Sequence, residues 1–207
     1  MTDCKPLLVP GVPTTVELPV EDVCDPEDVH RAQKTAGSLI WLSTRTRPDI
    51  TYAQSRISSM MTKAPKAAVQ EAMRVLRYLL GTKDVGLSFK ACANHKEVVA
   101  YTDANSSVQR SQTGVIVKLG DSVVAWRSMK QKEVAMSTAE SEVQALASAE
   151  ILADYVKTLR ESLCLPTPIM EIRCDNTAAI VLATGEGSWR TKAAANKVSA
   201  IREKVEY

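Results

Sequence analysis

The chain has 207 residues, 45% of them hydrophobic and 24% charged, a balance typical of one large or two small globular domains. Aromatic residues make up only 4% of the chain, which argues against a surface that stacks nucleic-acid bases on Phe and Tyr. No apolar run approaches the roughly 18–20 residues of a membrane span, and the first residues lack the layout of a secretory signal. We therefore expect neither a membrane partner nor secretion.

The net charge of +2 is unevenly distributed along the chain. Residues 1–42 carry 3 basic and 7 acidic side chains, residues 43–90 carry 9 and 3, and residues 91–207 carry 14 of each. The basic middle segment indicates a surface that faces a polyanion, although a solvated helix face explains it equally well. The five cysteines form no CxxC pair and the two histidines have no ligand-spaced neighbour, so we expect reduced thiols and no zinc site.

Residues 1–24 contain four prolines and no helical period, which predicts an extended lead-in. Three helices are predicted next, over residues 25–42, 48–61 and 65–81, with a proline near the start of each. The apolar stripe expected on the third helix consists of Val69, Met73, Leu76 and Leu80. We expect residues 25–90 to form a small helical unit with a basic exterior.

From about residue 98 the sequence changes to short runs rich in Val, Ile, Tyr and Trp, separated by clusters of turn residues. The simplest interpretation is three successive antiparallel strands, a long helix, a fourth strand and a short helix. These elements are expected at residues 98–104, 114–118, 122–126, 138–163, 169–174 and 176–183. A last helix, basic at its start, is expected to reach the C-terminus. This pattern predicts an α/β fold for residues 91–207.

Three acidic residues occupy the ends of these predicted elements. Asp103 ends the first strand, Glu142 lies in the first turns of the long helix, and Asp175 follows the fourth strand, where it would cap the next helix. If the first and fourth strands are parallel neighbours, their ends meet at one edge of the sheet, and a helix packed across the sheet brings its first turns there. Crowded carboxylates repel one another unless a cation lies between them. Mg²⁺ prefers such oxygen ligands and needs no His or Cys.

The pattern alone leaves two alternatives open. Each Asp at a strand end is individually more typical of a turn or a helix cap than of a metal ligand. Glu140 and Glu142 lie two residues apart, about 200° in helical projection, so only one of them can face the site. Glu140 is the candidate for stabilising the helix start, where acidic side chains are favoured.

From Tyr101 onward the sequence resembles the ribonuclease H domain of copia-type retrotransposon polyproteins. The matching words are Tyr101-Thr102-Asp103-Ala104, Ser111-x-Thr113-Gly114, Ala125-Trp126-x-Ser128-x-Lys130-Gln131, Ser137-Thr138-Ala139-Glu140-Ser141-Glu142 and Cys174-Asp175-Asn176-x-x-Ala179-Ile180. Upstream words resemble the segment that joins the reverse transcriptase of such polyproteins to its nuclease. They are Gly37-Ser38-Leu39-Ile40-x-Leu42, Thr46-Arg47-Pro48-Asp49-Ile50 and Leu76-Arg77-Tyr78-Leu79-x-Gly81-Thr82.

The resemblance covers nearly the whole chain and implies a fragment of a larger polyprotein. Residues 1–24 would be a lead-in, residues 25–90 a thumb or connection segment of the reverse transcriptase, and residues 91–207 the nuclease domain. The implied fold is a ribonuclease H-like mixed sheet, with three antiparallel strands and a parallel fourth, flanked by helices. A polymerase active site is not expected, because the chain has no paired Asp-Asp on a hairpin.

The resemblance also implies which acidic residues bind metal. The first and third ligands of the family fall on Asp103 and Asp175. The second lies in a word Glu-x-x-Ala, which the segment from Glu142 to Ala145 matches, so Glu142 is preferred and Glu140 is held in reserve. The family places a fourth acidic ligand on a final helix after a fifth strand. We find no counterpart before Tyr207, and we expect that last strand and helix to be missing from the chain.

The implied activity is two-metal hydrolysis, with Mg²⁺ or Mn²⁺, of the RNA strand of an RNA–DNA hybrid. The implied partners are that hybrid and the rest of the polyprotein, and the implied location is a cytoplasmic virus-like particle or the nucleus. Polar candidates for substrate binding beside the ligands, each with a cap or turn role as its alternative, are Asn105, Ser106, Ser137 and Asn176. Basic candidates for tracking phosphates are Arg45, Arg47, Arg74 and Arg77.

Two other functions are compatible with the sequence. The chain could be a non-catalytic module that binds nucleic acid or a partner protein and derives from a truncated or degenerate retroelement. It could also be a related nuclease or transposase of the same fold, although the upstream words favour a reverse-transcriptase connection.

Overall fold

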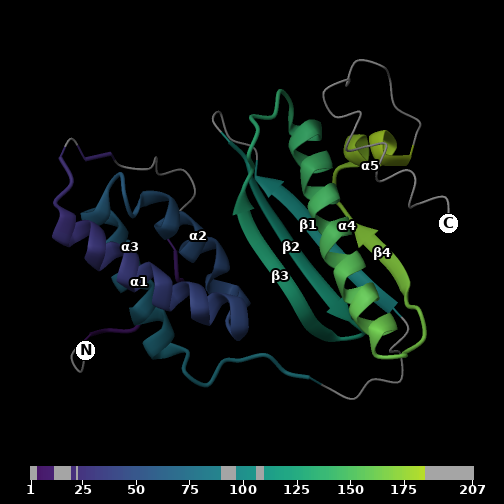
Figure 1. Cartoon of the computed structure of the whole chain (residues 1–207), viewed down its shortest axis with the longest axis horizontal. Coiled ribbons are helices and arrows are strands. Elements are labelled where there is room, and N and C mark those ends of the chain that lie inside the picture. Colours follow the sequence, from purple (N-terminus) through teal and green to yellow (C-terminus); the bar gives the residue numbers. More distant parts are fainter. Residues whose placement is uncertain (1–3, 12–19, 22, 90–96, 106–109, 185–207) are drawn as a thin grey trace. The chain divides into compact units, whose positions relative to one another are not determined.

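The structure is a computed structural model that describes residues 4–11, 20–21, 23–89, 97–105 and 110–184. The chain divides into two compact units, Met1–Leu87 and Ser88–Tyr207. Figure 1 labels the helices of the first unit and the sheet of the second. The expected C-terminal helix and the question of a fourth acidic ligand lie outside the described residues. Within the described part, no helix combines the length and the apolar character needed to cross a bilayer.

The first unit contains the three predicted helices. They are α1 (Pro26–Arg45), α2 (Thr51–Met60) and α3 (Pro65–Gly81), and a 3-10 turn, η1 (Pro48–Ile50), precedes α2. Asp25 caps α1 as expected, because its side chain accepts the backbone N–H of Glu27 at 2.9 Å. The three prolines at the helix starts supply the fixed φ that favours initiation there, and none of them removes a backbone bond inside a helix.

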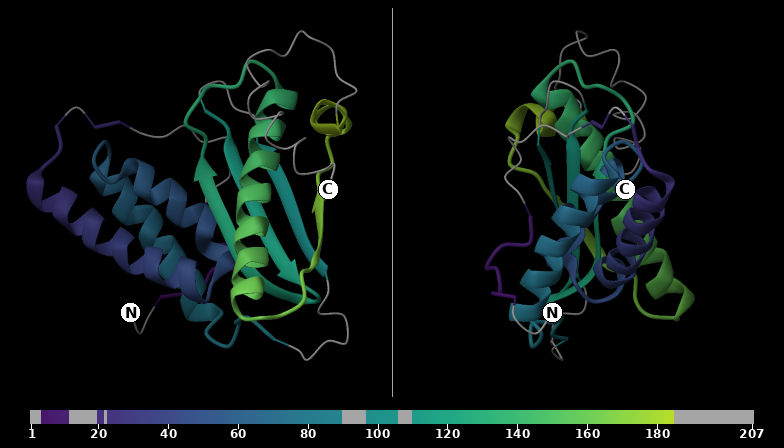
Figure 2. Two further views of the ribbon diagram at one scale, coloured as in Figure 1. Left: turned by 45° about the vertical axis from the view of Figure 1, so that its right-hand side comes forward. Right: turned by 90° about the vertical axis from the view of Figure 1, so that its left-hand side faces the viewer.

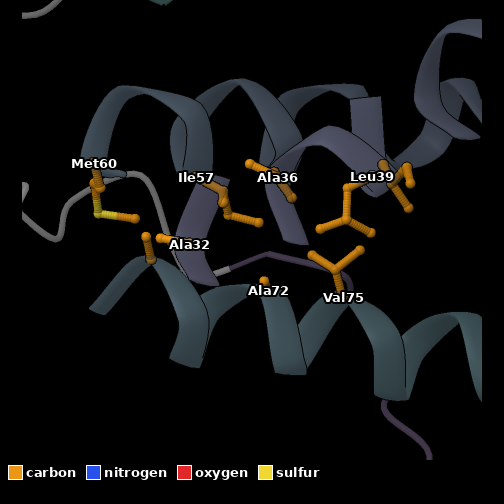
Figure 3. Close-up of a cluster of buried hydrophobic side chains, with 10 residues drawn as sticks. Ala32, Ala36, Leu39, Ile57, Met60, Ala72 and Val75 are labelled. Atoms are coloured by element: carbon orange, nitrogen blue, oxygen red, sulfur yellow. The ribbon is translucent and has the colours of Figure 1, made fainter. Parts of the chain in front are cut away.

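Small side chains form much of the core between these helices. The close-up in Figure 3 labels Ala32, Ala36, Leu39, Ile57, Met60, Ala72 and Val75. The stripe predicted on the third helix is confirmed in part, because Val69 and Leu76 pack against this core, whereas Met73 is 39% exposed. Ala68, Ala72 and Val75 are more deeply buried than the predicted residues. Alanines on the contact face allow closer helix packing, so the buried face of α3 is marked by small residues more than by its largest apolar ones.

A buried arginine links the end of α1 to the end of α3. Arg47, only 7% exposed, donates to both carboxylate oxygens of Asp49 at 3.0 and 2.8 Å and to the carbonyl and hydroxyl of Thr82 at 2.9 and 2.7 Å. The hydroxyl of Tyr78 donates to Asp49 at 2.7 Å. Burial opposes ionisation of Asp49, but the hydrogen bonds from Arg47 and Tyr78 outweigh it and lower the pKa of the carboxyl.

We predict that Arg47→Ala destabilises the protein at neutral pH by about 2–3 kcal/mol, because it leaves Asp49 partly buried without its counter-charge. The lowered pKa of Asp49 means that its stabilising effect is present above its ordinary value of 3.8 and is lost as the pH falls through the folded value. The difference between variant and parent should therefore shrink near about pH 3. Urea denaturation at both pH values measures this, with the exposed Arg74→Ala as the control. An equal loss in the two variants at neutral pH would contradict it.

The second unit is built on a four-stranded sheet with the order β3-β2-β1-β4. Its elements in chain order are β1 (Glu97–Asn105), β2 (Gln112–Leu119), β3 (Ser122–Lys130), α4 (Thr138–Ser162), β4 (Ile169–Arg173) and α5 (Thr177–Thr184). The β1–β2 and β2–β3 pairs are antiparallel, and β4 lies parallel to β1. The mixed sheet with flanking helices that was predicted is therefore confirmed. The views in Figure 2 show α4 lying across one face of this sheet.

Alternation along β1 determines which side chains meet α4. Val98 and Ala100 are buried in a cluster with Val115 and Val117 of β2 and with Ala149 and Ala153 of α4. Residues in phase with Val98 therefore face the helix, and Tyr101 and Asp103, in the opposite phase, are exposed. Asp103 is thus presented on the sheet face that α4 does not cover.

Candidate metal centre

Two strand ends meet where the acidic residues lie. Parallel pairing between β1 and β4 ends with Tyr101 opposite Arg173, so Asp103 and Ala104 continue beyond the last paired residue of β4. Cys174 and Asp175 follow β4 directly. β1 is longer than predicted, and Asp103 lies two residues before its end at Asn105 rather than directly before a turn. The predicted arrangement of first and fourth strands as parallel neighbours is confirmed.

The start of α4 separates the roles of its two glutamates. Ser137 is the N-cap and accepts the backbone N–H of Glu140 at 3.1 Å, and the carboxylate of Glu140 accepts the N–H of Met136 at 2.7 Å. The first bond satisfies an N–H that the first turn of the helix leaves free, and the second ties Glu140 to the residue that precedes the cap. Glu140 therefore serves the helix start, which was the role considered for it.

Glu142 is directed into the protein and is only 6% exposed. Its carboxylate accepts a hydrogen bond from the backbone N–H of Ala104, in the part of β1 that β4 no longer pairs. Burial is the main reason that the pKa of Glu142 is raised; the Ala104 bond opposes this, and the charges of Asp103 and Asp175 add to it. The three predicted ligands are thus close enough to interact electrostatically.

Within the described part of the chain, a group of three potential metal-ligand atoms includes a thiol. One ligand atom from each of Glu142, Cys174 and Asp175 lies within 4.8 Å of the others, and the thiol of Cys174 is 4.0 Å from Oε2 of Glu142. Asp103 is not in this group, although its charge raises the pKa of both Glu142 and Cys174. Sequence reasoning missed Cys174, and its position directly before Asp175 was the signal available.

The donor set fits a hard divalent cation. Burial, followed by the charges of Glu142, Asp175 and Asp103, raises the pKa of Cys174, although a backbone hydrogen bond from Asn176 opposes the shift. In the metal-free protein the thiol is therefore protonated at neutral pH. The carboxylate oxygens are the charged donors, and these suit Mg²⁺ and Mn²⁺.

The polar and basic candidates have varied surroundings. Asn176, not Asp175, caps α5, because its side-chain oxygen accepts the N–H of Ala179 at 3.0 Å. Asp175 therefore does not have the capping role that the sequence suggested for it. Asn105 is exposed at the end of β1, and Ser106 lies outside the described residues. Ser137 is occupied as the cap of α4.

The basic candidates belong to the first unit. Arg47 is held by Asp49 and Thr82 and is buried, which removes it from the phosphate-tracking set. Arg77 donates to the carbonyl of Lys5 at 2.8 Å, and Arg45 and Arg74 are exposed on their helices. Exposed guanidinium groups remain available to a polyanion, so Arg45 and Arg74 keep that candidate role.

Known proteins resemble much of the chain. It is 33% identical over 187 residues to the retrovirus-related Pol polyprotein from transposon RE1 of Arabidopsis thaliana, a match that covers 88% of this chain and 13% of that protein. It is 37% identical over 117 residues to the secreted RxLR effector protein 161 of Plasmopara viticola, covering 55% of this chain and 82% of that protein.

No model of a protein family matches the sequence. Among solved structures, RNase H1 from the halophilic archaeon Halobacterium salinarum NRC-1 aligns with a TM-score of 0.41 and 22% identity, over 53% of this chain and 77% of that one. The chain spans only 13% of the length of the transposon RE1 polyprotein. By its sequence it belongs to the family of retrovirus-related Pol polyproteins of copia-type transposons.

Proposed function

We propose that the second domain, residues 91–207, is a ribonuclease H-type nuclease that hydrolyses the RNA strand of RNA–DNA hybrids with two Mg²⁺ or Mn²⁺ ions. The observation that carries this proposal is the meeting of Glu142 and Asp175, with the charge of Asp103 close by, where β1 extends past β4. Family membership supports the same assignment and supports residues 25–90 as a reverse-transcriptase connection. The hybrid and the rest of the polyprotein are the proposed partners, in a cytoplasmic particle or the nucleus.

Asp103, Glu142 and Asp175 are the proposed metal-binding and catalytic residues. Bound divalent ions would activate the attacking water and stabilise the departing 3′ oxygen of the phosphodiester. The protein itself would contribute by fixing the positions of the carboxylates that bind the ions. The Ala104 N–H and the surrounding protein fix the Glu142 carboxylate, while Asp103 and Asp175 are exposed to an incoming polyanion. Without cations the same carboxylates repel a phosphate backbone, so hybrid binding and metal binding are expected to be coupled.

Asp103→Asn should reduce nicking of the RNA strand in a hybrid to background, because the substitution removes one of the proposed ligand charges while keeping the shape of the side chain. The assay uses a labelled RNA–DNA hybrid with Mg²⁺ or Mn²⁺, on the chain and on a version extended at its C-terminus. Asp121→Asn, at the exposed turn between β2 and β3, is the matched control and should cleave like the parent. Equal cleavage by the two variants would refute the assignment.

Glu142→Gln should make the metal-free protein more stable at neutral pH, raising Tm by about 2–4 °C. The raised pKa of Glu142 means that its contribution to stability is full below the ordinary value of 4.5 and is lost as the pH rises through the folded value. The gain in Tm should thus be absent below about pH 4 and present at neutral pH. Thermal unfolding with and without Mg²⁺ tests this.

Added Mg²⁺ should stabilise the parent and leave Glu142→Gln unchanged, because ligand binding to the folded state raises apparent stability. Glu161→Gln, at an exposed position of the same helix, is the control and should respond to Mg²⁺ like the parent. A variant at position 142 that is less stable than the parent at neutral pH would show that the carboxylates do not repel one another in this way.

A glycine lies opposite Asp103 on the neighbouring strand. Gly114 of β2 is the cross-strand partner of Asp103, and its φ is not in the left-handed region. A β-carbon added there would meet only the carbonyl oxygen of Asp103, at an ordinary 3.9 Å. Neither backbone conformation nor packing therefore requires a glycine. A glycine inside a strand is typical of sites where another backbone approaches closely, which supports access of a nucleic-acid strand to Asp103.

Gly114→Val should keep or raise stability, because valine favours strands, and should raise KM for the hybrid by about tenfold through steric exclusion of the substrate. Steady-state cleavage and thermal unfolding measure the two effects. Ile116→Val, two residues further along the same face of β2, is the control and should leave KM unchanged. A parent-like KM for Gly114→Val would show that the substrate does not pass over this position.

A non-catalytic binding module remains the second candidate function. It is favoured by the secreted effector of Plasmopara viticola, a similar protein matched over 82% of its length. Hybrid binding that needs no divalent metal, without cleavage in either length of chain, would support this candidate over the nuclease.

A further inference from the structure

Gln131 is a buried residue with a side-chain amide, and it has no role in the proposed reaction described above. It directly follows β3 and is only 4% exposed. Its side-chain Nε2 donates to the hydroxyl of Thr113 on β2 at 3.0 Å and to the carbonyl of Ser141 on α4 at 2.8 Å. Its backbone N–H donates to the carbonyl of Ser111 at 2.8 Å. One side chain therefore ties the sheet to the first turns of α4.

The orientation of this amide is determined by its partners. The carbonyl oxygen of Ser141 can only accept a hydrogen bond, so the side-chain nitrogen of Gln131 must face it. Both amide donors are used, and each binds a different element of the fold. Because Ser141 is itself completely buried, water cannot readily replace the amide at this point.

Both acceptors of the Gln131 amide lie next to residues that hold Glu142 in place. Thr113 is the cross-strand partner of Ala104, whose N–H binds the Glu142 carboxylate. Ser141 directly precedes Glu142 on α4. A shift of the first turns of α4 relative to β2 would therefore move the Glu142 carboxylate relative to Ala104 N–H.

We propose that Gln131 is a positioning residue that sets the place of α4 over β2 and so holds Glu142 where it can bind a divalent ion. This inference rests on the proposed role of Glu142 as a metal ligand. A purely structural role would reduce stability alone. A positioning role also weakens metal binding and lowers kcat while KM for the hybrid stays near the parent value, because Gln131 is buried away from the substrate.

The test uses Gln131→Met in the full chain, since methionine keeps the length of the side chain and removes both donors. Calorimetric titration with Mn²⁺ should show binding about 10–100-fold weaker than that of the parent. Gln54→Met is the matched control: Gln54 is also buried, but its amide donates to Ser58 in the first unit, at 2.6 Å. The control should bind Mn²⁺ like the parent, with thermal unfolding recorded for all three proteins.

Three results separate the possible failures. A parent chain that takes up no Mn²⁺ would overturn the proposed function and this inference with it. A folded Gln131→Met that binds Mn²⁺ with parent affinity would overturn the positioning role alone. If Gln131→Met does not fold, Thr113→Val removes one of the two acceptors and should weaken Mn²⁺ binding by a smaller factor. Parent-like affinity in that variant would overturn the inference.

Discussion

The acidic site depends on a difference in strand length. β1 continues past the point where its parallel pairing with β4 ends, at Tyr101 and Arg173. The backbone of Ala104 consequently has no partner on β4, and an unpaired N–H inside a protein is costly unless another acceptor reaches it. The Glu142 carboxylate is that acceptor. The shorter fourth strand thus leaves a gap in the sheet edge that a side chain of α4 fills, and it brings Asp175 to the same place.

Burial and repulsion between carboxylates destabilise the charged form of Glu142 in this gap. Glu142 is buried, and two other carboxylates raise its pKa further. Fold stability and ion binding are therefore in opposition when the site is empty of cations, since charges suited to binding a metal repel one another in its absence. The thiol of Cys174 adds no further charge in the metal-free protein, because its raised pKa keeps it protonated beside the carboxylates. The site has charge where a hard cation needs it and a neutral group where further charge would be costly.

Most of the architecture could be predicted, because chain order and capping residues carry it. The Asp25 cap and the helix starts at proline follow from local signals, whereas the parallel placement of β4 was implied by the resemblance to the ribonuclease H domain. The buried face of α3 could be predicted only in part, because Val69 and Leu76 contact the core as expected. The small residues Ala68 and Ala72 are fully buried and Met73 is not, which the pattern of large apolar residues could not indicate. The cap of α5 was assigned one residue early, since Asp175 and Asn176 are equally good caps and only the backbone selects between them. The hydrogen bonds of Gln131 could not be predicted, because its partners lie 18 and 10 residues away in the sequence.

In the first unit, the guanidinium of Arg47 binds Thr82, which lies 35 residues further along the chain. During synthesis this guanidinium can pair with Asp49, two residues away, but it lacks its Thr82 acceptors until the end of α3 has been made. The first two helices can form earlier, but the polar cluster that closes the unit forms last, after a loop of that length has been closed. A nascent chain that pauses between α2 and α3 would therefore expose the apolar faces of both early helices until the apolar residues of α3 cover them.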